Sequence, residues 1–312
     1  MTAFAFVFPG QGSQAVGMLD AWGDHPAVRD TLAEASAALG EDLTALIKQG
    51  PKDQLDLTTN TQPVMLTAGI ACYRAWLAET GLTPAAVAGH SLGEYTALVA
   101  AGSLSLADAL PLVRLRAQAM QEAVPVGVGA MAAILGLDAD AVRATCLEAA
   151  AASGEAVEAV NFNDPKQTVI AGTKAGVDKG CELLKAKGAK RALLLPVSAP
   201  FHSSLMKPAA ERLKVRLAQI QLSAPVIPVV NNIDVSVANE PDAIRDALYR
   251  QAFGPVRWVE VVQALRARGL THIIECGPGK VLAGMVKRID AEAVSATIFD
   301  PASLAEVKGI LA

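Results

Sequence analysis

The chain is poor in cysteine, in aromatic residues and in net charge, and each shortage excludes a class of function. Its 312 residues include four cysteines without C-x-x-C spacing, so we expect reduced thiols and neither a zinc site nor a disulfide framework. Aromatic residues make up 4% of the chain, too few for base-stacking surfaces, and a net charge of −4 disfavours binding to a phosphate backbone. The composition therefore predicts no nucleic-acid partner and no metal.

Long apolar runs are also missing. No stretch approaches the roughly 20 apolar residues that span a bilayer. The apolar segment 3–8 has neither a basic flank nor a cleavage site, and it runs into the glycine loop Pro9-Gly10-Gln11-Gly12 as a strand does, unlike a signal peptide. The sequence predicts a cytoplasmic protein that does not enter a membrane.

Apolar residues are plentiful: hydrophobic residues make up 52% of the chain and charged residues 19%, so a large core can be buried. The length suggests about two domains, or one α/β domain with an insertion. Helices are expected to open at His25-Pro26, at Thr61-Gln62-Pro63 and near Ser105, where Pro111 should kink the helix or delay its first turns.

The organisation changes between residues 126 and 197. There the pattern reads β-α-β-β-α-β, which is the order of a split βαβ, ferredoxin-like unit. We therefore predict an α/β fold in which residues 1–125 and 198–312 form a core around a parallel sheet. Residues 126–197 are predicted to form an inserted ferredoxin-like subdomain.

The pentapeptide Gly89-His90-Ser91-Leu92-Gly93 fits the G-x-S-x-G nucleophile elbow. It follows a short apolar strand and precedes a helical run, and glycines on both sides of Ser91 permit the strained turn. A chance match is the alternative, since small residues are abundant in this chain. The strand–turn–helix context favours Ser91 as a nucleophile.

A serine nucleophile needs a base, and the chain has four histidines. His25 adjoins a helix start, His272 lies in an apolar strand, and the side chain of His90 should diverge from that of its neighbour Ser91. His202 lies at a strand-to-helix junction, where functional loops of open α/β sheets gather. By elimination we predict His202 as the base, oriented by a carboxylate, a backbone carbonyl or an amide.

Two further features permit two interpretations each. The loop at residues 10–15 matches G-x-G-x-x-A, but the expected helix after it excludes a dinucleotide fold. It forms either a tight turn or an oxyanion site that uses the N–H groups of Gln11 and Leu92. Arg114 and Arg116 should face different sides of one apolar helix; either could clamp a carboxylate, although solvated or ion-paired arginines are the simpler interpretation.

Taken together, these motifs resemble those of the malonyl-CoA:acyl carrier protein transacylases, the stand-alone acyltransferases of bacterial type II fatty acid synthesis. The resemblance covers nearly the whole chain. Its segments are residues 8–14 (FPGQGSQ), 60–63 (NTQP), 89–94 (GHSLGE), 114–116 (RLR), 129–131 (GAM), 161–163 (NFN), 200–203 (PFHS), 255–258 (PVRW) and 275–280 (ECGPGK).

The resemblance implies an α/β-hydrolase-like core with a ferredoxin-like insertion, and ping-pong transfer of malonyl from malonyl-CoA to the thiol of acyl carrier protein. We also expect a monomer that uses no cofactor. The residue roles that the resemblance implies are Ser91 as nucleophile, His202 as base, Gln11 and Leu92 as oxyanion donors, Arg116 as the malonyl carboxylate ligand, Met120 and Phe201 as acyl-pocket residues, and Gln251 as the support of the histidine.

Other functions share part of this pattern. A trans-acting polyketide acyltransferase would share all the chemistry and differ in its carrier. A serine esterase or thioesterase would release the acid to water and would not need Arg116, and a non-catalytic acyl-CoA-binding module would need neither Ser91 nor His202. For an acidic carrier the densest basic cluster is Lys185, Lys187, Lys190 and Arg191, with Lys214 and Arg216 as a competing pair.

Overall fold

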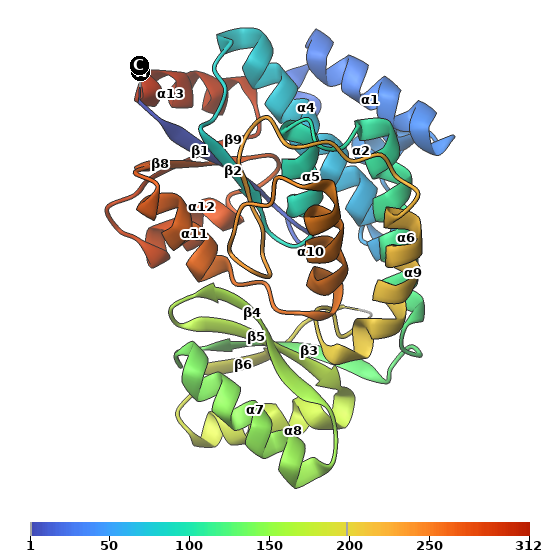
Figure 1. Ribbon diagram of the computed structural model, residues 1–312, viewed down its shortest axis with the longest axis vertical. Coiled ribbons are helices and arrows are strands. Elements are labelled where there is room, and N and C mark those ends of the chain that lie inside the picture. Colours follow the sequence, from blue (N-terminus) through green and yellow to red (C-terminus); the bar gives the residue numbers. More distant parts are fainter. Residues whose placement is uncertain (1, 198) are drawn as a thin grey trace.

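A five-stranded parallel sheet forms the centre of the larger part of the molecule (Figure 1). The computed structural model describes residues 2–197 and 199–312. The strands lie in the order β7-β2-β1-β8-β9, and every neighbouring pair runs parallel. Their bounds are β1 (Phe4–Phe8), β2 (Ala86–Gly89), β7 (Val229–Val230), β8 (His272–Cys276) and β9 (Val294–Ile298). The predicted α/β class with a parallel sheet is confirmed.

Strand β1 divides its side chains between two apolar cores, because successive residues of a strand face opposite sides of the sheet. The three phenylalanines of β1 pack into the larger core, whereas Ala5 and Val7 pack into the smaller one. Helices α11 (Trp258–Ala267) and α12 (Val281–Ile289) cover the face of the smaller core. Both faces of the sheet are therefore covered, as parallel sheets require.

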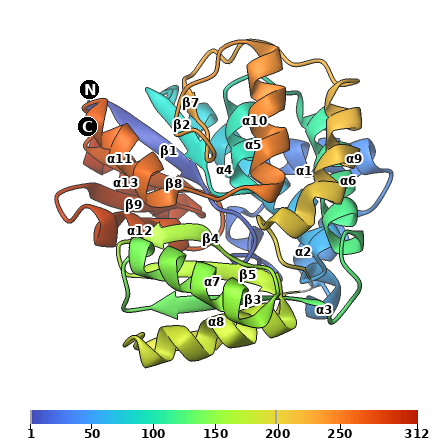
Figure 2. The ribbon, with the colours of Figure 1, turned by 60° about the horizontal axis from the view of Figure 1, so that its bottom comes forward.

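The larger core lies under most of the remaining helices (Figure 2). These are α1 (Pro26–Leu39), α2 (Leu43–Gln49), α3 (Lys52–Leu55), α4 (Thr58–Thr80), α5 (Gly93–Ala100), α6 (Leu106–Glu122), α9 (Lys207–Leu217), α10 (Pro241–Phe253) and α13 (Pro301–Leu311). The predicted helix after His25-Pro26 is confirmed. No helix of the described residues is long and apolar enough to cross a membrane.

The predicted start of one helix was wrong, and of the two effects predicted for Pro111 the delay is excluded. Helix α4 begins at Thr58, three residues before the predicted start, and Pro63 lies inside it. The carbonyl of Leu57 accepts the N–H groups of Asn60 and Thr61, which closes the first turn ahead of the proline. Helix α6 begins at Leu106, so Pro111 does not delay it, because Ser105 Oγ caps the helix by accepting from the N–H of Asp108 (3.0 Å).

A second, antiparallel sheet has the order β4-β5-β3-β6. Its elements are β3 (Gly129–Leu135), α7 (Ala139–Ser153), β4 (Val157–Asp164), β5 (Gln167–Thr173), α8 (Lys174–Ala186) and β6 (Arg191–Leu194). This is the predicted ferredoxin-like arrangement, with α7 and α8 packed on one face (Figure 1). The other face packs against Leu195, Val197 and Phe201. Residues 1 and 198, where the two predicted core segments begin, lie outside the described residues.

Candidate active site

Ser91 occupies the turn between β2 and α5, with a left-handed φ of 52°. The turn demands glycine on both sides: a Cβ added to Gly89 would lie 1.9 Å from the carbonyl carbon of Gly93, and one added to Gly93 would lie 2.1 Å from the carbonyl oxygen of Phe8. The amide of Asn232 clamps the turn, since its Oδ1 accepts from the Ser91 N–H (2.7 Å) and its Nδ2 donates to the Gly89 carbonyl (2.7 Å). The turn therefore has the geometry of a nucleophile elbow.

His202 lies beside this serine. Its Nε2 is 2.7 Å from Ser91 Oγ, and its Nδ1 is 2.9 Å from the backbone carbonyl of Gln251. A carbonyl only accepts, so Nδ1 carries the proton and Nε2 is free to accept from the serine hydroxyl. Among the described residues no carboxylate contacts His202; of the three predicted kinds of orienting group, a backbone carbonyl is present.

Burial lowers the pKa of His202 to about 3, and the positive charge of Arg116 adds to the effect. The side chain is 4% exposed. An imidazole with so low a pKa is neutral at physiological pH, which is the state that accepts a proton. The pair can therefore begin a reaction with Ser91 as nucleophile and His202 as base.

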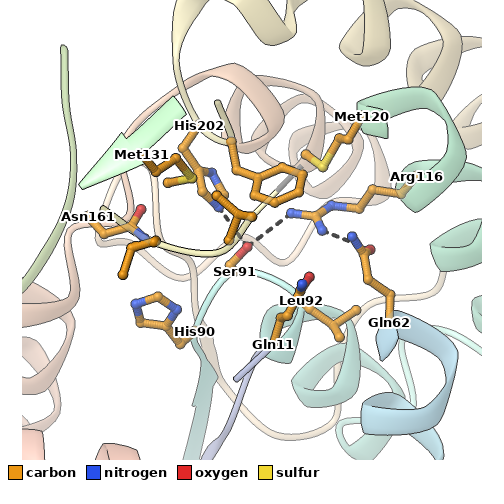
Figure 3. Close-up of a pocket in the computed structure, with 13 residues that line it drawn as sticks. Gln11, Gln62, His90, Ser91, Leu92, Arg116, Met120, Met131, Asn161 and His202 are labelled. Carbon is orange, nitrogen blue, oxygen red and sulfur yellow. Dashed lines mark hydrogen bonds between the residues drawn. The ribbon is translucent and has the colours of Figure 1, made fainter. Parts of the chain in front are cut away.

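The guanidinium of Arg116, from α6, completes this group (Figure 3). One of its nitrogens donates to Gln62 Oε1 (2.9 Å) and the other to Gln251 Oε1 and Ser91 Oγ (both 3.1 Å). It is 2% exposed, and no described carboxylate forms an ion pair with it. Arg114, in contrast, forms a bidentate ion pair with Glu41. A buried, unpaired cation beside a nucleophile suits a substrate carboxylate.

A cavity of about 140 Å³ opens in front of Ser91. Seven of the eight predicted site residues line it: Gln11, Ser91, Leu92, Arg116, Met120, Phe201 and His202. The eighth, Gln251, is fully buried behind Arg116. Within the described part of the chain, the backbone N–H groups of Gln11 and Leu92 have no acceptor, so both can serve a ligand.

The sequence interpretation missed other residues around the cavity. The additional lining residues are Gln62, His90, Met131, Asn161, Leu195 and Val197. Met131 and Asn161 come from the antiparallel sheet, so the cavity lies between the two sheets. The side chain of His90 bonds Asn163 Oδ1 (2.8 Å), away from Ser91. The NFN triplet, one of the segments that carry the resemblance, was the available signal for Asn161.

The described residues contain no cluster of three or more His, Cys, Asp or Glu side chains that could hold an ion. The four cysteines are free thiols, three of them buried and Cys181 half-buried. Burial raises the pKa of Cys72 and of Cys146 to about 12, which makes both thiols unreactive.

The sequence is similar to known acyltransferases over nearly its whole length. The acyl transferase domain family matches residues 5–300. The malonyl CoA-acyl carrier protein transacylase of Escherichia coli (strain K12) is 55% identical over 306 residues, 98% of each chain. The protein of the same name from Bacillus subtilis (strain 168) is 46% identical over 305 residues, 97% of this chain and 96% of that one.

Solved structures of malonyltransferases superpose closely on this chain. The acyl-carrier-protein S-malonyltransferase of Burkholderia pseudomallei 1710b superposes with a TM-score of 0.96 at 68% identity, covering 98% of this chain and 99% of that one. A malonyl-transacylase in complex with its type II PKS acyl-carrier protein superposes with a TM-score of 0.95 at 49% identity, covering 97% and 98%.

Proposed function

The chain belongs to the acyl transferase family, among the malonyl CoA-acyl carrier protein transacylases, and from that premise we propose that Ser91 carries the malonyl group from malonyl-CoA to the phosphopantetheine thiol of acyl carrier protein. The observation that carries this proposal is the contact of Ser91 Oγ with both His202 and Arg116. One contact supplies a base, and the other supplies a cation for the free carboxylate of malonyl.

The first half-reaction forms an ester. Ser91 Oγ attacks the thioester carbonyl while its proton passes to Nε2 of His202. The negative charge that develops on the carbonyl oxygen is stabilised by the N–H groups of Gln11 and Leu92. When the carbon–sulfur bond breaks, coenzyme A leaves as a thiolate and takes the proton from His202, which leaves a malonyl ester on Ser91.

The second half-reaction reverses these steps with a different thiol. The carrier thiol gives its proton to His202 and attacks the ester carbonyl; the carbon–oxygen bond breaks, and Ser91 regains the proton. The low pKa of His202 means that the imidazolium is a transient proton carrier, so the proton moves on to the leaving group. One thioester replaces another, and the transfer therefore runs in both directions.

Selection of malonyl is assigned to Arg116, and the fit of the acyl chain to Met120 and Phe201. Arg116 is held by the two amides of Gln62 and Gln251, so its fork is fixed before substrate arrives. Phe201 and Met120 are apolar neighbours in the cavity and limit the size of the acyl group. Acetyl lacks the carboxylate that a buried guanidinium favours.

We propose that the carrier belongs to fatty acid synthesis, as the resemblance of the sequence motifs implies; the Escherichia coli relative is named for an acyl carrier protein. The complex of a similar malonyl-transacylase with a type II PKS carrier supports a polyketide carrier as the second candidate. Malonyl transfer to one carrier of each kind, compared by kcat/KM, separates the two. We propose an acidic carrier that docks on the exposed cluster of Lys185, Lys187, Lys190 and Arg191, at the amino end of β6.

The remaining parts of the proposal concern the whole chain. We infer that residues 1–125 with 198–312 and residues 126–197 are two domains, because each range has its own sheet and its own apolar core. We also infer that the protein is a cytoplasmic monomer. We infer that it acts without a cofactor, since acyl transfer between thiols needs only a nucleophile and a base.

Intact-protein mass spectrometry tests the proposed function. Wild type and Ser91→Ala are mixed with malonyl-CoA, and separately with acetyl-CoA, without a carrier. A malonyl adduct that requires Ser91 and persists until a carrier thiol is added is the expected result. Rapid loss of the acyl group to water identifies an esterase or thioesterase, and malonyl-CoA binding without an adduct identifies a binding module.

A further inference from the structure

Glu94 is a buried carboxylate that the proposed reaction does not use. It lies in the first turn of α5, three residues after the nucleophile, and is 2% exposed. Its Oε2 accepts from the backbone N–H of Asn232 (2.8 Å) and from Nε2 of Gln251 (3.0 Å). It therefore connects two segments that hold the active site, the loop after β7 and helix α10.

The Gln251 amide contacts three groups around the nucleophile. Its Nε2 donates to Glu94 and to the backbone carbonyl of Ser91 (3.0 Å), while its Oε1 accepts from Arg116 (3.1 Å). With Glu94 ionised, a rotated amide would bring its oxygen against a carboxylate and a carbonyl, neither of which can donate, and its NH2 group against a cation. Glu94 and the carbonyl of Ser91 thus leave the amide one favourable orientation.

The same amide separates two buried charges. Among the described residues, the Arg116 guanidinium donates only to neutral oxygens. The carboxylate of Glu94 lies on the other side of the Gln251 amide, which bonds both groups. Burial raises the pKa of Glu94 to about 7, and Arg116 acts against this rise. An uncompensated guanidinium is costly to bury, so the carboxylate across the amide also helps to keep Arg116 in the cavity wall.

From these contacts we propose that Glu94 is a positioning residue for malonyl selection, acting through Gln251 to hold the Arg116 guanidinium where the malonyl carboxylate binds. This inference rests on the proposed function. It assigns to Glu94 an effect on Arg116 and none on the His202 proton, because the His202 contact uses the backbone carbonyl of Gln251 and not its amide.

The test compares Ser91 acylation by malonyl-CoA and by acetyl-CoA, measured as the ratio of the two kcat/KM values. Glu94→Ala should lower this ratio about tenfold, the effect of losing one hydrogen bond to a charged group. Glu94→Gln should keep most of the ratio, because its amide oxygen can still accept from Gln251 and Asn232. In a Gln251→Ala background, Glu94→Ala should cause no further loss of the malonyl/acetyl ratio, since the amide that connects Glu94 to Arg116 is already absent.

Glu275→Ala is the matched control. Glu275 is fully buried and has a similarly raised pKa, but it bonds the N–H of Ala283 at the start of α12. Its loss should reduce stability without changing the malonyl/acetyl ratio. Glu94→Gln keeps the shape of the side chain, so an equal loss of malonyl and acetyl transfer in this variant contradicts the proposal even where Glu94→Ala unfolds.

Two results overturn the inference. One is an equal loss of malonyl and acetyl transfer in Glu94→Ala and Glu94→Gln, which marks a structural role alone. The other is a fall in the malonyl/acetyl ratio on Glu94→Ala that is as large in the Gln251→Ala background as in the wild-type background. If wild type forms no malonyl ester on Ser91, the proposed function itself fails, and the role of Glu94 in selection fails with it.

Discussion

At the scale of single residues, the site depends on side chains whose charge state is set by burial. Ser91 Oγ contacts both His202 and Arg116, so packing within the protein holds the proposed base and the cation beside the same oxygen. Such preorganisation removes the cost of assembling them in each turnover. The charge on Arg116 and the neutrality of His202 are therefore the two properties to test.

Arg116→Ala should reduce kcat/KM for malonyl-CoA by roughly 100-fold, since a charge-assisted bidentate contact is lost. The rate with acetyl-CoA should change by less than about threefold, because acetyl makes no such contact. Arg114→Ala is the control: this arginine is paired with Glu41 and should leave the malonyl/acetyl ratio as in wild type. Equal losses with both acyl groups would remove Arg116 from its assigned role.

His202 links stability to pH. Its folded pKa of about 3 lies below the ordinary value of 6.5, so its contribution is fully present above pH 6.5 and is lost as pH falls towards 3. The loss amounts to as much as about 5 kcal/mol. Urea unfolding between pH 7 and pH 4 should show a shallower decline for His202→Asn than for wild type. Parallel declines would mean that His202 is not buried as a neutral imidazole.

At the scale of elements, the elbow between β2 and α5 is set by close backbone contact. Gly93→Ala places a Cβ 2.1 Å from the carbonyl oxygen of Phe8, which the sheet cannot accommodate without moving β1. We expect a loss of at least about 3 kcal/mol in unfolding free energy, together with loss of Ser91 acylation. Gly309→Ala, in α13 with open space around the new methyl group, should instead stabilise by about 0.5–1 kcal/mol.

The junction between β8 and α12 has a second pH-dependent group. Burial raises the pKa of Glu275 from 4.5 to about 7, so its contribution to stability is fully present below pH 4.5 and is lost as pH rises through 7. Glu275→Gln still accepts from Ala283 but carries no charge. Relative to wild type, it should gain up to about 3 kcal/mol between pH 5 and pH 8. Chemical unfolding at the two pH values measures this gain; no relative gain would contradict the assignment.

Elements with strong local signals were predicted well. Helix α1 begins at the proline after His25 and ends at Gly40 in a left-handed conformation, so local chemistry set both ends. The start of α4 was misplaced, because a proline inside a helix costs local stability that burial in the core offsets. The helix propensity of a short segment does not include the stabilisation that burial in the folded chain provides.

At the scale of the whole molecule, the cavity belongs to neither sheet alone. Ser91, the proposed nucleophile, follows the carboxyl end of β2 in the parallel sheet, where ligands of open α/β folds bind. Met131 and Asn161 reach the cavity from the antiparallel sheet. The junction of the two sheets therefore shapes the site.

Docking of the carrier belongs to the same scale, because it depends on surface charge outside the cavity. Changing Lys185, Lys190 and Arg191 to Glu should raise KM for the carrier about tenfold and leave acylation by malonyl-CoA unchanged, as expected when charged rim residues steer an acidic partner. The same reversal at Lys214 and Arg216 is the comparison. A higher carrier KM from that pair alone would place the docking surface on α9.

The sequence alone predicted the chemistry: the elbow motif points to Ser91, elimination among four histidines points to His202, and the alternation of elements indicates an α/β class. These features are local, encoded within a few neighbouring residues. The tertiary structure decided that Arg116 and not Arg114 faces Ser91, and that a backbone carbonyl from α10 contacts His202. It also joined Glu94, Gln251 and Arg116, which lie in three different helices. Contacts between distant segments arise only when packing brings their helices together, and residue spacing along the chain does not contain them.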